Sequence, residues 1–317
     1  MQVTRWIDKK KKNIDEAIEA LTSHDGMDIE KKSGTWNNLR TQKAVEKNQE
    51  MAIGERNIVF NVVTYSYSVT LSDDSLPIEE RTTKRSGKVI VYWEKENPIK
   101  YIINRNFDAL TVLRFLLAYN SKNEIIDNQP KLNTDMFDWL IKKIYLKEND
   151  IELASGDSVL SIDNLVGFKG HPADEEKTVS VVSTAGTTVM NILSTLSFLL
   201  ESAEIKQVEF NVSCGEHENI KLMLSEKVLG SDVNKYEGIL DDDVNIDKLL
   251  KEAKIYLLCY LKLLPAIMQN YDFSKTVDKE DPESEKPSWS SEVHTKFLER
   301  VAKDLQEKID TRVSQIK

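Results

Sequence analysis

The chain has little of several residue types, and each shortage excludes a class of protein. Only two cysteines, Cys214 and Cys259, occur among 317 residues, which is too few for a disulfide framework and fits a reducing cytoplasm. Because no run of about eighteen uncharged apolar residues is present, we expect no membrane-spanning segment and no membrane partner. The segment Met1–Lys12 lacks the apolar core of a signal peptide, so we expect no secretion and assign a cytoplasmic location.

Side chains suited to catalysis or metal binding are also scarce. Four histidines are present, and none lies in a Gly-x-Ser-x-Gly elbow or beside either cysteine in a known nucleophile signature. Cys214 and His217 have the spacing of one pair of zinc ligands, but a closed zinc site needs four ligands. No Gly-x-x-x-x-Gly-Lys-Ser/Thr loop occurs. We therefore predict no catalytic residue, no metal site and no cofactor.

The charge balance argues against a protein that coats nucleic acid by bulk electrostatics, because the formal net charge is −10. A local basic patch is still compatible with that total. Lys84, Arg85 and Lys88 lie close together in the sequence, aromatic residues follow them, and Arg105 comes in the next segment. Basic residues interleaved with aromatic ones can hold phosphates and stack bases. These four side chains are the predicted contacts if nucleic acid is a partner.

Alternating apolar and polar residues predict an antiparallel meander in the first half of the chain. Residues 57–71 alternate strictly, which indicates a strand with one buried and one solvated face. Two more strands are predicted at 88–94 and 99–104, after a charged loop at 72–86.

Helical periodicity predicts several helices along the chain. They are expected at 4–32 (one helix or two), 107–119 with Asn106 as cap, 133–147 with Asn133 or Thr134 as cap, 187–202, and 246–270, which Pro265 should end or kink. On the helix 133–147, Asp135 and Asp138 lie near Lys142 and Lys143, which suits exposed ion pairs.

The order of elements favours an α+β fold over a regular alternation of strands and helices. We predict an N-terminal helical segment at 1–56, an antiparallel sheet with helices at 57–150, and a second region at 151–271 in which strands flank a buried helix. Short strands are expected at 151–170, 178–183, 206–213 and 219–224. An acidic linker at 272–288 then leads to a long amphipathic helix at 289–317.

The C-terminal helix is the predicted partner-binding element. Apolar residues recur on it every four positions, and the stripe is longer than a lone solvated helix needs. It must therefore dock on the body of the protein, on another protein or on a second copy of the chain. The predicted contact residues are Phe297, Val301, Leu305 and Ile309, and the stripe also includes Val293 and Val313.

A turn rich in small hydroxyl residues predicts an alternative, a nucleotide sensor. Ser183, Thr184, Gly186, Thr187 and Thr188 run from a predicted strand into a predicted helix, whose N-terminus favours a phosphate. Over about eight residues this run resembles the Ser-Thr-x-Gly-Thr-Ser/Thr turn of CARF domains. The resemblance implies binding of a cyclic oligonucleotide. In that family the motif follows the first strand of a Rossmann-like unit, whereas here no repeated strand–helix pattern follows.

The layout of hairpin, apolar helix and short strand from Val89 to Asn128 is similar to that of phage-exclusion proteins of the RexA type, which associate with DNA. This likeness is one of order only and carries over no residue. A role in phage defence or prophage regulation is compatible with this layout, and no particular residue indicates it. Our prediction from the sequence is thus a non-enzymatic α+β binding protein that acts through protein or nucleic-acid contacts.

Overall fold

The fold is given by a computed structural model. It describes residues 1–31, 34–71, 75–121, 123–153, 159–172, 180–183, 200, 202–241, 247–280 and 291–316. The chain divides into two compact units. Unit 1 is Met1–Gln129 with Asn245–Leu257, and unit 2 is Pro130–Val244 with Leu258–Lys317. The predicted boundaries at 56, 150 and 271 differ from this division, because residues 1–56 contribute strands to the sheet of residues 57–129.

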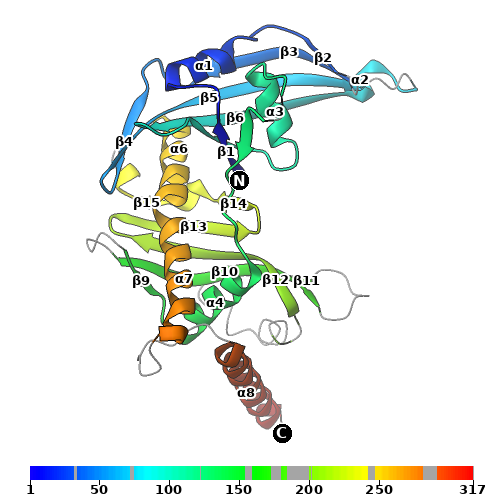
Figure 1. The fold of residues 1–317 in the computed structure, drawn as a ribbon. Coiled ribbons are helices and arrows are strands. Elements are labelled where there is room, and N and C mark those ends of the chain that lie inside the picture. The colour runs from blue at the N-terminus through cyan, green and yellow to red at the C-terminus, as the bar shows by residue number, and fades with distance from the viewer. Residues whose placement is uncertain are drawn as a thin grey trace. The chain divides into compact units, whose positions relative to one another are not determined.

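Unit 1 is built on an antiparallel sheet (Figure 1). Its main path runs β1-β7-β6-β5-β3-β2, with β4 beside β5 and β8 beside β1. The strands are β1 (Gln2–Asp8), β2 (Ile29–Lys31), β3 (Gly34–Lys43), β4 (Gln49–Ile53), β5 (Arg56–Leu71), β6 (Thr82–Glu94), β7 (Lys100–Ile103) and β8 (Ile125–Asp127). The helices are α1 (Ile14–Thr22), α2 (Ile78–Arg81), α3 (Ala109–Leu116) and α6 (Lys248–Leu258), which belongs to unit 1 up to Leu257.

The predicted meander is confirmed, since β5 pairs with β6 and β6 pairs with β7 in chain order. The alternation within β5 also has the predicted effect. Tyr65 and Tyr67 are each 3% exposed, whereas Ser66 between them is exposed. The strand β6 is longer than predicted and includes residues 82–86 of the expected loop, because these residues pair with the far end of β5.

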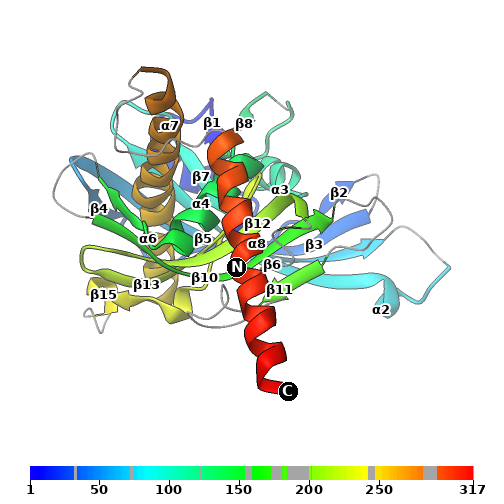
Figure 2. The same ribbon diagram turned by 90° about the horizontal axis from the view of Figure 1, so that it is seen from below.

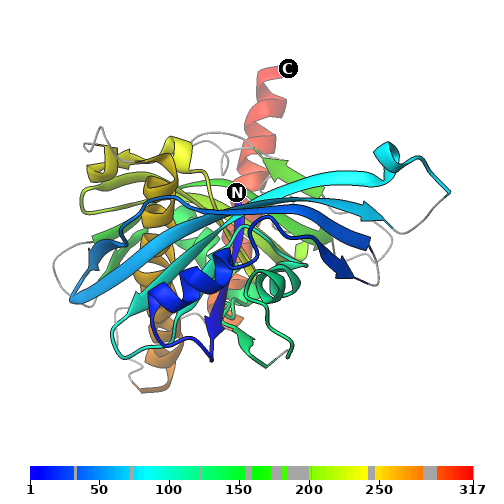
Figure 3. The same ribbon diagram turned by 90° about the horizontal axis from the view of Figure 1, so that it is seen from above.

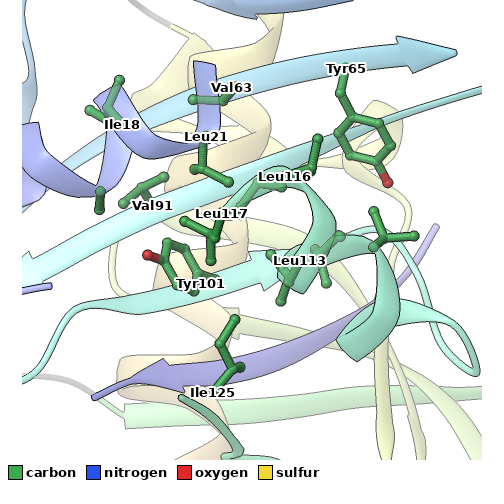
Figure 4. Packing of buried hydrophobic residues seen from close by; sticks show 14 of the residues in the cluster. Ile18, Leu21, Val63, Tyr65, Val91, Tyr101, Leu113, Leu116, Leu117 and Ile125 are labelled. Atoms are coloured by element: carbon green, nitrogen blue, oxygen red, sulfur yellow. The ribbon is translucent and has the colours of Figure 1, made fainter. Parts of the chain in front are cut away.

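Helices α1 and α3 cover one face of this sheet, as Figure 3 shows from above. Their apolar faces meet strand residues in one continuous core (Figure 4). Leu21 of α1 and Leu113 of α3 are fully buried there, as are Val91 of β6 and Tyr101 of β7. The opposite face of the sheet buries Val62, Ile90 and Ile102, which lie side by side in register, and α6 reaches that face through the ion pair Lys88–Glu252.

Unit 2 contains a second antiparallel sheet, ordered β11-β10-β12-β13-β14, with β9 beside β10 and β15 beside β13 (Figure 2). Helix α4 packs on β10 and β12, and α7 packs on α4 and β9. The strands are β9 (Asp150–Glu152), β10 (Val159–Pro172), β11 (Ser180–Ser183), β12 (Ser202–Cys214), β13 (His217–Ser225), β14 (Val228–Ser231) and β15 (Glu237–Gly238). The helices are α4 (Thr134–Leu146), α7 (Leu264–Glu280) and α8 (Ser291–Ile316), with a π-helical turn at Cys259–Leu263 and short 3₁₀ turns at Val233–Lys235 and Ile239–Asp241. The mixed α+β class, the antiparallel sheets and the long C-terminal helix are therefore as predicted.

The N-terminal segment differs from the prediction, because residues 4–8 form strand β1 and not a helix. The predicted helix included Ile7, which lies in β1. The helix α1 starts only after Asn13, whose side-chain oxygen accepts a hydrogen bond from the Glu16 backbone N–H at 2.9 Å. An asparagine that caps a helix in this way leaves the preceding residues free to join a sheet.

The predicted cap of α3 was wrong. Helix α3 begins at Ala109, and Asp108 stands at its cap position without a side-chain bond to the helix. The carboxylate of Asp108 is instead 3.6 Å from a guanidinium nitrogen of Arg85 and 3.6 Å from one of Arg105. An ion pair with two arginines therefore replaces the capping bond. By contrast, Asn133 caps α4 as predicted, accepting from the Met136 N–H at 2.9 Å.

Pro265 does not end the helix in which it lies. The π-helical turn Cys259–Leu263 precedes it, and the Leu264 N–H bonds to the Cys259 carbonyl. Pro265 is then the second residue of α7, where a missing N–H is tolerated. Helix α7 continues to Glu280, so residues 272–280 of the expected linker are helical, and Lys275 lies 3.7 Å from Asp135 of α4.

Candidate functional site

The predicted phosphate-binding turn lies almost wholly outside the described residues. Ser183 is the last residue of β11 and pairs with Gly167 of β10. Thr184, Gly186, Thr187 and Thr188 are not among the residues that the structure describes, nor is most of the helix expected at 187–202. The nucleotide-sensor hypothesis therefore stays a prediction.

Three of the predicted nucleic-acid contacts lie on β6, and they do not share one face of the unit 1 sheet; Arg105 follows the end of β7. The register of β6 is regular, so Lys84 and Lys88 share one face, and Arg85 lies on the other. Lys84 and Lys88 pair with Ser68 and Thr64, on the face of β5 opposite to that of Tyr65 and Tyr67. Arg85 pairs with Tyr67, on the face that α1 and α3 cover.

Three of these four cations already have protein partners. Arg85 and Arg105 share the Asp108 carboxylate, and Lys88 forms an ion pair with Glu252 of α6. Arg105 also donates from Nε to the Tyr65 hydroxyl at 3.1 Å. Within the described residues, only Lys84 of the four has no carboxylate partner. The structure therefore does not bring the four charges together as one surface for a phosphate backbone.

A close contact at Gly87 involves the Tyr65 hydroxyl, which is a hydrogen-bond partner of Arg105. A Cβ atom at Gly87 would overlap the Tyr65 hydroxyl and approach the Asn104 side-chain oxygen at 2.6 Å. That Asn104 oxygen accepts a hydrogen bond from the Lys88 N–H at 2.8 Å. Burial raises the pKa of Tyr65 to about 12, so its hydroxyl stays neutral and accepts from Arg105. This cluster is structural, since its polar groups satisfy one another.

The predicted stripe on α8 divides into a buried half and an exposed half. Phe297 is 5% exposed and Val301 is fully buried, whereas Ile309 is 40% exposed. The Phe297 ring meets the Tyr145 ring edge-on at 5.6 Å, and the Tyr145 hydroxyl donates to Asp304. The first half of α8 therefore docks on the C-terminal end of α4 within unit 2.

The spacing of the stripe explains this division. A step of four residues exceeds one helical turn by about 40°, so the stripe winds around the helix. Ile309 and Val313 lie about 80° and 120° around the axis from Val301. They face solvent, and Val313 is 46% exposed.

The cysteine–histidine pair forms part of a hairpin. Cys214 pairs with His217 where β12 turns into β13, and the His217 Nδ1 atom is 2.6 Å from the Tyr236 hydroxyl. Burial lowers the pKa of His217 and raises the pKa of Cys259 to about 12. Among the residues with described placement, no group of three or more potential ligands has the geometry of a metal site. No helix in that part of the chain has the length and apolar character needed to cross a membrane.

The expected exposed position of the charged side chains on α4 is wrong for Lys142. Lys142 is only 6% exposed and lines a cavity together with Trp139 and Lys143. Burial also raises the pKa of Asp138 to about 7, with the nearby Asp135 adding to the rise. Sequence spacing placed these side chains on one helix, but their burial depends on the distant helix α7.

These features define an α+β protein with two antiparallel sheet units and a partly docked C-terminal helix. No protein-family model matches the chain, and neither does any curated protein sequence.

Proposed function

We propose that this protein acts by binding and that it pairs with a second copy of itself through the exposed side of α8. The observation that carries the proposal is the division of α8, a helix of 26 residues. Its first turns are held in unit 2 by Phe297 and Val301, while Ile309 and Val313 remain exposed. Large apolar side chains in a row on a helix that is already anchored favour a partner surface.

The exposed side of α8 has the spacing of a short coiled-coil seam. Leu298, Ala302, Leu305 and Ile309 follow one another at intervals of four, three and four residues. Leu298 and Leu305 are half-buried, and Ala302 and Ile309 are exposed. This seam lies beside the face that contacts Tyr145, so unit 2 can hold α8 while the seam meets another helix.

The seam is self-complementary when two copies run antiparallel. Pairing centred on residue 307 sets Leu305 against Ile309 of the other copy, and Ala302 against its Arg312. The small alanine leaves room for the long arginine side chain, whose stem can cover the seam. A self-complementary patch of this kind is what a symmetric two-fold pairing requires.

Two substitutions in the seam test the proposal. Leu305→Asp combined with Ile309→Asp places charges in the centre of the pairing, and burial of each such side chain contributes roughly 1.5–3 kcal/mol. The parent chain is expected to elute with a light-scattering mass of twice 36.3 kDa, and the variant is expected to dissociate at least about a hundredfold more readily.

A matched control carries Thr311→Asp with Ser314→Asp, which adds the same charge on the far side of α8, where both residues are exposed. It should keep the mass of the parent. Phe297→Asp is not a suitable test, because Phe297 is buried against Tyr145 and its loss damages unit 2 itself. A parent chain that is monomeric at every concentration, or a control that dissociates as readily as the seam variant, contradicts self-pairing.

A further inference from the structure

We propose that the outer edge of β6 at residues 82–87, in unit 1, binds an extended peptide that carries an acidic residue. Strand β6 pairs with β5 along its whole length, whereas β7 pairs with the other edge only at residues 89–92. Figure 1 shows β5 and β6 running together towards α2. Within the described residues, no strand pairs with the outer edge of β6 between residues 82 and 87.

The backbone of Lys84 points out from this edge. Lys88 marks the outer side, because its N–H donates to the Asn104 side-chain oxygen at 2.8 Å and its carbonyl accepts from the Asn104 N–H. The pairing of β5 with β6 has no register shift, so alternate residues of β6 repeat this direction. The N–H and carbonyl of Lys84 and the N–H of Ser86 therefore point away from β5. None of these three groups has a hydrogen bond within the part of the chain that the structure describes.

A strand edge of this kind accepts an extended peptide through main-chain hydrogen bonds. In antiparallel pairing, a residue of the incoming strand that lies opposite Lys84 exchanges two hydrogen bonds with it. A further donor is the Ser86 N–H, whereas the Ser86 carbonyl already accepts from Arg105 Nη2 at 3.3 Å. The open stretch therefore suits a short strand of about five residues.

The side chains along the edge favour an acidic partner. Residues 82–88 read Thr-Thr-Lys-Arg-Ser-Gly-Lys and include no acid. Lys84 is exposed and has no carboxylate partner among the described residues. A residue opposite Lys84 points its side chain to the same face, so a glutamate or aspartate there forms a cross-strand ion pair. A second copy of the edge is disfavoured, because symmetric antiparallel pairing sets like charges opposite each other.

Carboxylates near the edge do not cancel the charge of Lys84. Asp108 contacts Arg85, whose side chain lies on the opposite face of β6. Glu252 forms its ion pair with Lys88, about 13 Å along the strand from Lys84. The other acids near the edge lie on α2, which ends before the edge begins. An acidic residue of the peptide therefore meets Lys84 without a competing carboxylate.

An exposed phenylalanine lies in the segment beside this edge. Arg105 contacts Ser86 and Asp108 contacts Arg85, and Phe107 between them is fully exposed. The neighbours of the acidic residue in the incoming strand point to the face of Arg85, which this segment adjoins. An apolar side chain there covers part of the Phe107 ring and removes it from water. The ligand class is therefore an extended peptide in which apolar residues flank an acidic one.

Two fluorescent pentapeptides with capped ends test this inference on the full chain. Thr-Val-Glu-Val-Thr presents a glutamate to Lys84, and Thr-Val-Lys-Val-Thr presents a lysine. Fluorescence anisotropy should show saturable binding of the glutamate peptide and about fivefold weaker binding of the lysine peptide. Methylation of the glutamate backbone nitrogen should weaken binding about tenfold, because it removes the hydrogen bond to the Lys84 carbonyl. This methylated peptide tests the pairing without altering the protein.

Substitutions at Lys84 separate the charge from the backbone. Lys84→Ala should bind the two peptides equally, because it keeps the outward N–H and loses the charge. Lys84→Pro should bind neither peptide, since proline has no N–H. Its melting temperature should stay close to the parent's, because this N–H makes no bond to β5 and proline is tolerated at a strand edge. Lys95→Ala is the matched control, since Lys95 is an exposed lysine in the turn between β6 and β7.

Equal binding of the two peptides by the parent chain, full binding by Lys84→Pro, or unchanged binding after methylation would overturn the inference. An effect of Lys95→Ala as large as that of Lys84→Ala would do the same. If the light-scattering mass of the parent falls in Lys84→Pro, a second copy fills the edge instead. Phe107→Ala should weaken both peptides alike, and unchanged binding contradicts the apolar contact. The readout is independent of self-pairing, because none of the substituted residues lies on α8.

Discussion

Replacing Asp8 by asparagine is expected to destabilise unit 1 by about 3 kcal/mol. Asp8 ends strand β1 and is 1% exposed. Its Oδ1 atom accepts from the backbone N–H groups of Lys10 and Lys11 at 2.7 and 3.0 Å. Its Oδ2 atom accepts from the hydroxyls of Tyr101 and Tyr119 at 2.6 and 2.8 Å. Both oxygens therefore face donors only.

The magnitude follows from this geometry. Asparagine replaces one oxygen by an NH₂ group, which is itself a donor, so the two donors that face that oxygen lose their nearer acceptor; of these, the Tyr119 hydroxyl also lies 3.0 Å from Oδ1. A hydrogen bond to a charged group contributes about 1.5–3 kcal/mol, and partial reorientation of a hydroxyl recovers some of it. Burial raises the pKa of Tyr101, with Asp8 adding to the rise, so this hydroxyl remains a donor at neutral pH.

Hydrogen exchange read by mass spectrometry locates the effect. In Asp8→Asn, peptides from β1 and β7 should exchange faster, because Asp8 ties β1 to Tyr101 of β7. Urea unfolding followed by tryptophan fluorescence gives the free-energy change. Asp15→Asn is the matched control, since Asp15 is exposed and accepts one hydrogen bond from Asn48. The reasoning is refuted if Asp8→Asn lies within about 0.5 kcal/mol of that control and exchange in β1 is unchanged.

Substitutions at three further residues test other parts of the structure. Gly87→Ala should lower the stability of unit 1 by about 1–3 kcal/mol in denaturant unfolding, because its methyl group overlaps the Tyr65 hydroxyl; an unchanged midpoint would show that this contact relaxes freely. Asn133→Ala should cost about 1 kcal/mol by removing the cap bond to Met136, and Asn133→Asp should restore most of it; equal melting of both variants contradicts the capping role. The raised pKa of Asp138 means that the folded chain keeps a proton that the unfolded chain loses between about pH 4 and pH 7, so stability falls as pH rises through this window. Thermal melts of Asp138→Asn should show a flatter pH profile over the same range, and a profile identical to the parent's would exclude Asp138 as its source.

The sequence predicted the elements whose pattern is local. The strict alternation in β5 predicted a strand with Tyr65 and Tyr67 on its buried face, and Asn133 predicted the start of α4. Such patterns are reliable because a side chain's direction repeats with the period of the element that carries it. The long amphipathic helix at the C-terminus was visible for the same reason.

Predictions from local patterns were wrong where contacts with residues far away in the sequence determine the secondary structure. Residues 4–8 became a strand because β7 and β8 offer it hydrogen bonds from positions more than ninety residues away. Pro265 lies inside a helical stretch because the π-helical turn Cys259–Leu263 precedes it, and at the second residue of α7 the missing N–H is tolerated. Residues 272–280 are helical although polar, since Tyr271 packs on Trp139 of α4.

Composition and periodicity alone determined that this chain folds as a mixed α+β protein with one long terminal helix, because those properties depend on neighbours in the sequence. Only the tertiary structure decided where each charged side chain lies. It set Arg85 and Arg105 against Asp108, and Lys88 against Glu252, whereas Lys142 came to line a cavity. The physical reason is that the energy of a charge depends on the solvent and the countercharges around it, and folding brings these from distant parts of the chain.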